Sequence, residues 1–313
     1  MPASYTHQCI ARDAARALSL FKDDQLRAAL TAGSEGPDPF FFSLIPMPGT
    51  LYAPTLGSMM HTQKTGDFLI ALAKACAASD VTRAYCCGFL SHYAADTTFH
   101  PFVYAHSRDE QGRYSGTVHC TLEHELETLL YRRRGHQTGV PQQMAGFIHL
   151  TRENKAEIAK ALSAALDEVF PEYRLGLSRV RRSFEDASFF CTLLRSPSGR
   201  RYRAFGALAG VAGLDKALHA HMMPAQPPKE DIANDARAPW SSPWQPEQAR
   251  TESFDALFAV AVARAQVLIP AALSFMEGKL DESSFRALIG DLSYDSGLPW
   301  QATRPARELM ETP

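Results

Sequence analysis

Residues 88–100 read Gly-Phe-Leu-Ser-His-Tyr-Ala-Ala-Asp-Thr-Thr-Phe-His. On a helix, His92, Asp96 and His100 stand at i, i+4 and i+8, so the three side chains share one face a turn apart. Imidazole and carboxylate groups stacked in this way are ligands that suit Zn²⁺. Pro101 disfavours helical geometry at the residue before it, which predicts that the helix ends at His100. His100 is therefore expected to turn toward a different ion from the one bound by His92.

Residues 119–127 carry the same chemistry on a second predicted helix. His119 and Glu123 lie one turn apart, and six of the eleven histidines fall between His61 and His124. One such pair alone is usually only an exposed contact, but three His/carboxylate spacings within 36 residues favour a multinuclear metal site. His124 points about 100° away from Glu123 on a helix, so we leave it out of the site.

Apolar residues recur at helical spacing along nearly the whole chain, which predicts an all-α protein without a substantial sheet. We expect one domain over 1–313, with a metal-site half at 1–135 and an accessory helical half at 136–313. A Gly/Pro loop is expected at 33–48, and a long Pro-rich loop with Trp240 and Trp244 at 223–250. Helices are expected at about 7–32, 62–78, 80–99 with Asp80 as N-cap, 117–133, 152–169, 173–194, 203–222, 251–277 and 281–291.

Composition excludes several classes of protein. The chain has 32 Lys plus Arg against 34 Asp plus Glu, so it has no global positive field for nucleic acid or an anionic membrane. The apolar stretch 258–273 is interrupted by Arg264, Gln266 and Pro270, which predicts that no helix spans a membrane. The N-terminus has no secretory pattern, so we expect a cytoplasmic location. The six cysteines form no C-x-x-C pair and are interpreted as small buried hydrophobic residues.

With these motifs in place, the chain resembles the zinc-dependent phospholipase C family, whose fold is shared by trinuclear zinc nucleases. It looks closest to an intracellular bacterial branch whose members begin Met-Pro-x-x-Tyr-x-His. The matching motifs occur in family order and are Tyr5-Thr6-His7, Gly36-Pro37-Asp38, Met60-His61, the stretch from Gly88 to Asp96, His100-Pro101, and His119-x3-Glu123-x3-Glu127.

The resemblance implies a multi-helix bundle with two zinc ions, and a third site near His7. It implies that one zinc is held by Asp38, His61, His92 and Asp96. It implies a second zinc held by His100, His119 and Glu123, and a third held by His7 with Asp96 bridging. Asp38 would also orient or deprotonate the attacking water. The secreted enzymes bind the third zinc through a processed N-terminal Trp, whereas here His7 itself lies close to the start of the chain.

The expected function is hydrolysis of a phosphodiester by a metal-bound hydroxide. By resemblance, a phospholipid is the first substrate class and a nucleic acid, as in a zinc nuclease, the second. The alternative is a non-enzymatic helical protein that is stabilised by its metal and binds a partner through the Pro/Trp segment. The sequence shows no strongly basic amphipathic helix, so it favours a small or dispersed phosphodiester over an intact bilayer.

Overall fold

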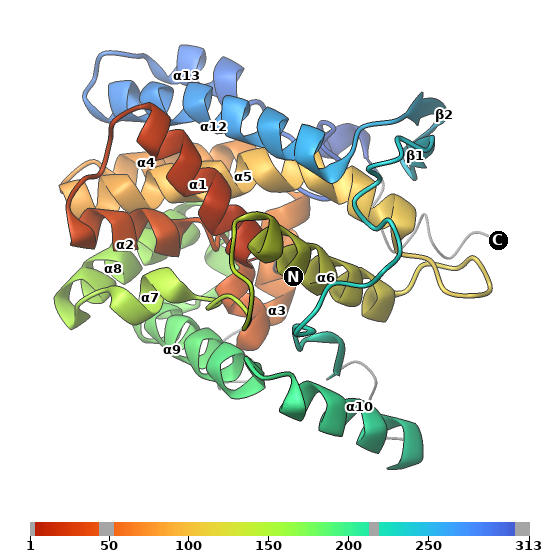
Figure 1. Ribbon diagram of the computed structural model, residues 1–313. Helices are drawn as coiled ribbons and strands as arrows, with labels where there is room; N and C mark the ends of the chain where they lie inside the picture. The colour runs from red at the N-terminus through yellow and green to blue at the C-terminus, as the bar shows by residue number, and fades with distance from the viewer. Residues whose placement is uncertain (1–3, 44–52, 213–218, 304–313) are drawn as a thin grey trace.

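The computed structural model describes residues 4–43, 53–212 and 219–303. Within these ranges the regular secondary structure consists of helices and one two-stranded antiparallel hairpin, which confirms the all-α prediction (Figure 1). The first half contains α1 (Ser4–Ala17), α2 (Asp24–Gly33), η1 (Asp38–Phe42), α3 (Ala53–Thr62), α4 (Thr65–Cys76), α5 (Asp80–His106) and α6 (Gly116–Arg133). The second half contains α7 (Ala145–His149), α8 (Arg152–Val169), η2 (Pro171–Tyr173), α9 (Gly176–Leu194), α10 (Arg200–Ala212), β1 (Trp240–Ser242), β2 (Gln245–Arg250), α12 (Phe254–Met276), α13 (Glu282–Ile289) and η3 (Trp300–Ala302).

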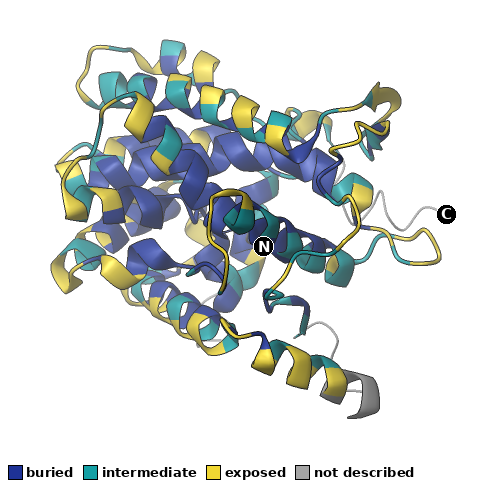
Figure 2. Cartoon of the chain, in the orientation of Figure 1, coloured by how far each residue is buried: buried dark blue, intermediate teal, exposed yellow. Residues whose placement is uncertain are grey.

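Helix α5 is the core of the molecule. Every residue from Ala84 to Val103 is buried, and α1, α2, α4, α6, α8 and α12 all contact this helix (Figure 2). A helix that is buried all round can carry polar side chains only where other polar groups meet them. The polar stripe of α5 is therefore expected to face partners from the surrounding helices.

Facing glycines let α2 and α5 approach with their backbones in contact. A Cβ atom at Gly33 would lie 1.9 Å from the carbonyl oxygen of Tyr85, and one at Gly88 would lie 2.0 Å from that of Leu30. This close approach brings the chain after α2 over the face of α5. Gly36, with φ +53°, then passes so near to His92 that a Cβ atom would lie 2.3 Å from its ring. Only glycine fits there.

Several predicted helix boundaries were wrong for identifiable reasons. The single helix over 7–32 is divided, because Asp23 accepts the backbone N–H groups of Gln25 and Leu26 and so caps a new helix, α2. Ser79, whose hydroxyl accepts from Thr82, is the N-cap of α5 in place of Asp80. Helix α3 was not predicted, and it lies just before α4, the helix predicted at 62–78. The first part of the helix predicted over 203–222 is present as α10. The later part of that prediction includes 213–218, which lie outside the described residues.

Pro101 does not end α5, which continues to His106 with the proline inside it. The helix is held there by burial on every side, and proline in a helix interior mainly removes one hydrogen bond and strains the preceding turn. His100 therefore stays on the same helical face as His92 and Asp96.

Helix α12 confirms the helix predicted at 251–277. It is one 23-residue helix that, by length and composition alone, could cross a membrane. Arg264 does not break it, because its guanidinium donates to the Thr97 hydroxyl of α5 at 2.6 Å. Leu257, Ala261 and Leu268 are buried, and α12 packs along α5 and α1. A core helix passes the same test of length and composition.

The Pro-rich segment is ordered and anchored by tryptophan, as predicted. Its hairpin pairs β1 with β2. The Trp240 ring is buried against Phe102 of α5, with ring centroids 5.3 Å apart, and its indole N–H donates to the carbonyl of Glu252. Trp244 contacts Tyr104 at 5.0 Å. The hairpin therefore packs on the C-terminal end of α5. The prediction of a single domain stays a prediction.

Candidate metal centre

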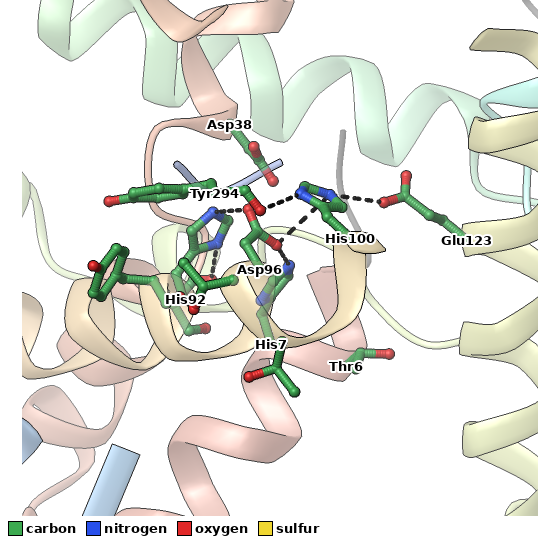
Figure 3. A network of polar contacts seen from close by, with 12 residues as sticks. Thr6, His7, Asp38, His92, Asp96, His100, Glu123 and Tyr294 are labelled. Atoms are coloured by element: carbon green, nitrogen blue, oxygen red, sulfur yellow. Dashed lines mark hydrogen bonds and ion pairs between the residues drawn. The ribbon is translucent and has the colours of Figure 1, made fainter. Parts of the chain in front are cut away.

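All eight residues predicted as metal ligands meet in one buried cluster. They come from five elements, and α5 alone contributes three of them (Figure 3). Each of these residues is at most 5% exposed. The contributors are His7 from α1, Asp38 from η1, His61 from α3, His92, Asp96 and His100 from α5, and His119 and Glu123 from α6.

The eight side chains form three groups, and within each group the potential ligand atoms lie within 4.8 Å of one another. Each group joins imidazoles to a carboxylate, which suits a zinc ion. The group of His100, His119 and Glu123 has the composition that the resemblance implied, whereas Asp96 falls in the group of His7 and His92 and not in that of Asp38 and His61. The groups are Asp38, His61 and His92; His100, His119 and Glu123; and His7, His92 and Asp96.

Asp96 stands at the centre and offers its two oxygens to different histidines. Its Oδ1 lies 3.2 Å from Nε2 of His7 and 3.8 Å from Nε2 of His100. Its Oδ2 lies 2.9 Å from Nε2 of His92 and 3.6 Å from Nε2 of His61. A carboxylate placed this way can bridge two neighbouring ions, as predicted for Asp96.

Backbone carbonyls fix the orientation of three imidazoles. Nδ1 of His61 lies 2.7 Å from the carbonyl oxygen of Gly57, and Nδ1 of His92 lies 3.0 Å from that of Ser34. Nδ1 of His100 faces a carbonyl at 3.1 Å in the same way. A carbonyl can only accept, so Nδ1 carries the proton in each ring and, in the neutral form, Nε2 keeps its lone pair for a metal.

These lone pairs point at carboxylate oxygens. Nε2 of His61 lies 3.3 Å from Oδ1 of Asp38. Among the described residues, this Oδ1 atom and the Nε2 atoms of His61 and His92 are buried without a hydrogen-bond partner. Buried acceptors facing one another are costly unless a cation or a proton stands between them. The residues present therefore fit zinc.

The electrostatics agree with this interpretation. Burial raises the pKa of Asp96, but His100, His92 and His7 outweigh burial and hold it well below its usual value. Burial lowers the pKa of His100, whereas Asp96 and Glu123 raise it to about 9. Burial lowers the pKa of His119. The carboxylates are thus ionised at neutral pH, and a metal competes with a proton at His100.

Tyr294 and Asp295 complete the centre, and sequence reasoning missed both. The Tyr294 carbonyl accepts from His100, and its backbone N–H donates to the carbonyl of His61 at 2.8 Å. Its ring packs on His61 with centroids 5.2 Å apart. Oδ1 of Asp295 lies 3.9 Å from Nδ1 of His100. These residues lie far along the chain, in a loop without periodicity, so no spacing in the sequence marked them.

Two further buried carboxylates hold the start of α1. Oε1 of Glu127 accepts the backbone N–H groups of Tyr5 and Thr6. Oε1 of Glu35 accepts the hydroxyl of Ser4 at 2.7 Å and the amide of Gln8 at 3.1 Å. Burial raises the pKa of Glu35 to about 7 and that of Glu127 well above its usual value. The turn that carries His7 is thereby fixed between α2 and α6.

His124, which the sequence analysis left out of the site, and His106 lie outside the three groups. His124 is buried, its Nδ1 faces the carbonyl of Cys120 at 2.8 Å, and its Nε2 faces the Gln143 amide. His106 packs on Phe102 with centroids 4.3 Å apart. Five of the six cysteines are buried, and all six are free thiols, as predicted.

Comparison with known proteins adds one finding. A sequence model of the family described as zinc dependent phospholipase C matches residues 6–175, more than half of the 313-residue chain. The matched range contains all eight predicted ligands. No curated protein and no solved structure matches the chain.

Proposed function

Because the chain belongs to the zinc-dependent phospholipase C family, we propose that it is a zinc-dependent hydrolase of phosphodiesters. Phospholipids are the first substrate class, since the family is named for them. The observation that carries the proposal is the set of three neighbouring buried His/carboxylate groups, two of which share His92.

The ligand count supports catalysis over a purely structural role. Structural zinc sites are closed by four protein ligands, usually with thiolates, whereas catalytic sites keep a position open for water or substrate. Here each group contains three protein residues, none of them a cysteine. The non-enzymatic alternative would require the open positions to have no use.

Bound zinc supplies a coordinated water of lowered pKa and a Lewis acid for phosphoryl oxygens. The chain's own residues position that chemistry. Asp38 is ionised, because His92 and His61 outweigh its burial and lower its pKa. Its Oδ1 atom has no hydrogen-bond partner among the described residues, so it can accept a proton from the attacking water. The carbonyls behind His61, His92 and His100 hold those rings still.

A substrate panel with a matched variant tests the proposal. Zinc-loaded protein is assayed on a chromogenic phosphodiester, the corresponding monoester, a phospholipid and single-stranded DNA, beside Asp96→Asn. We expect diester hydrolysis that the variant lacks. Stoichiometric zinc without hydrolysis of any diester would support the metal-stabilised binding protein. Preference for DNA would instead indicate a nuclease.

A further inference from the structure

A cavity of about 560 Å³ lies between α7, α8 and α9, on the lower left of the molecule in Figure 1. None of the eight candidate ligands lines it. It is therefore separate from the metal centre, and the proposed hydrolysis gives it no role.

The cavity is lined by three cations and one carboxylate. The cations are Arg152, Lys155 and Arg181, and the carboxylate is Glu185. Within the described parts of the chain, none of the three cations lies in an ion pair, whereas the next residue, Arg182, is paired with Asp186 at 2.7 Å. An unneutralised group of cations around a cavity attracts an anion.

The local backbone adds to this field. Arg152 is the first residue of the 18-residue helix α8, and Lys155 lies one turn later on it. The N-terminal end of a helix carries partial positive charge that favours phosphate groups. Charge and helix end thus point to the same class of ligand, a phosphate anion.

Apolar side chains surround the cations. The cavity floor is formed by Phe147 and Phe184, which are buried and stacked with ring centroids 4.3 Å apart. Ile148 lines the cavity and is 42% exposed. Leu177, one turn before Arg181 on α9, is 43% exposed.

This exposure is concentrated on one part of the described surface. Four of the eight large apolar side chains that are most exposed there belong to α7 and α9, where Figure 2 shows an exposed outer side of α9. Those four are Ile148, Leu177, Phe189 and Leu193. Large exposed apolar side chains beside arginine and lysine are typical of surfaces that bind lipid membranes. The cations contact the lipid headgroups, and the apolar side chains insert at the boundary between headgroups and acyl chains.

We infer that the α7–α8–α9 face docks the protein on an anionic phospholipid surface. A lipid phosphate is held by Arg152, Lys155 and Arg181 in the cavity, and Ile148 and Leu177 enter the apolar edge of the lipid layer. The inference goes beyond the proposed hydrolysis, because vesicle binding needs no turnover. It also deepens the proposed function, because it predicts that the protein meets its phospholipid substrate in a lipid layer and not as single dissolved molecules.

Vesicle flotation of the full chain tests the inference. Phosphatidylcholine vesicles are compared with vesicles that also contain phosphatidylglycerol, and the protein is expected to bind the latter at least about tenfold more tightly. The variant Arg152→Gln/Lys155→Gln/Arg181→Gln should lose about a hundredfold, or about fivefold for each charge. Ile148→Ser/Leu177→Ser should lose about tenfold on the anionic vesicles.

The matched control is Lys229→Gln/Arg237→Gln, which removes exposed charges from the loop before β1. It should bind vesicles like the wild type. All variants should melt cooperatively and hydrolyse a soluble phosphodiester at the wild-type rate, so failure of hydrolysis and failure of docking are separate results.

Four results would overturn docking. One is equal binding to both kinds of vesicle, and another is equal loss in the control and cavity variants. The third is a wild-type chain that binds inorganic phosphate but not vesicles, which would reveal a site for soluble anions. The fourth is a wild-type chain that does not bind vesicles but forms dimers by light scattering. If Ile148→Ser/Leu177→Ser dissociated these dimers, the face would bind a second copy of the chain.

Discussion

The carboxylate of Glu127 on α6 accepts the backbone N–H of Thr6 at 3.3 Å, one residue before His7. The N–H groups in the first turn of a helix have no partner within the helix. Glu127 supplies one from another helix, and it also accepts from Tyr5. The histidine that belongs with Asp96 is thus positioned by a residue that does not itself belong to any metal group.

Glu127→Ala should therefore weaken the metal group that contains His7 more than the other two. We expect one metal ion fewer per chain by elemental analysis, and a loss of about 1–3 kcal/mol in the free energy of unfolding. Glu127→Gln keeps an acceptor oxygen and should restore most of both. The control is Glu125→Ala on the same helix, which should retain full metal content. Equal effects of the alanine and glutamine variants would contradict this role.

Chelation should destabilise the protein. Protein purified without chelator is expected to hold at least two zinc ions per chain, since removal leaves buried acceptors facing one another. A metal present at a thousand times its Kd stabilises a fold by about 4 kcal/mol. Adding EDTA should lower Tm, and adding zinc should restore it. A melting curve unchanged by EDTA, with metal far below one ion per chain, would refute the whole centre.

Substituting Glu123, a predicted metal ligand, should abolish a function that substituting its neighbour His124 leaves intact. Glu123→Gln should reduce hydrolysis by more than the roughly 10–100-fold loss typical of removing an outer partner of a ligand. His124→Ala should lower stability, because His124 is buried, yet keep the metal content and the activity of the folded protein. Loss of metal in His124→Ala, measured on folded protein, would show that the groups are misassigned.

Asp38→Asn should lower kcat more than it changes KM. The amide keeps the shape of the carboxylate but cannot accept a proton, so a loss of roughly 10²–10⁴-fold in kcat is expected. Metal content, measured in the same samples, shows whether the zinc is still bound. A variant affected only in KM would remove the role of Asp38 in activating water.

The sequence predicted the centre well because its main ligands lie on helices. The i, i+4 spacing put His92, Asp96 and His100 on one face, and the order of the family's motifs supplied His7, Asp38 and His61. The resemblance placed His100 with Glu123, and Nε2 of His100 does lie 3.5 Å from Oε1 of Glu123. The expectation that the helix ends at Pro101 was wrong. Because the helix continues past Pro101, His92 and His100 lie two turns apart on it, and so His92 contacts Asp96 while His100 also reaches Glu123 on α6.

What the sequence could not show depends on contacts between distant segments. Tyr294 meets His100 across 194 positions, and neither its loop nor its neighbours carry a period. The exposed face formed by Ile148 and Leu177 comes from two separate helices, and neither helix alone is a strongly basic amphipathic segment. The sequence therefore favoured a dispersed substrate, whereas the inferred docking on lipid depends on contacts that only the fold creates.

Glu35 predicts a stability difference that depends on pH. Burial raises its pKa from the ordinary 4.5 to about 7 in the folded protein. The folded state therefore binds the proton more tightly than the unfolded state, and the stability this gives is complete below pH 4.5 and lost as pH rises through 7. Glu35→Gln mimics the protonated acid at every pH. In urea unfolding, the variant should match the wild type near pH 4.5 and exceed it by about 3 kcal/mol at pH 8. A difference that is constant with pH would show that the carboxyl of Glu35 does not change protonation between these conditions.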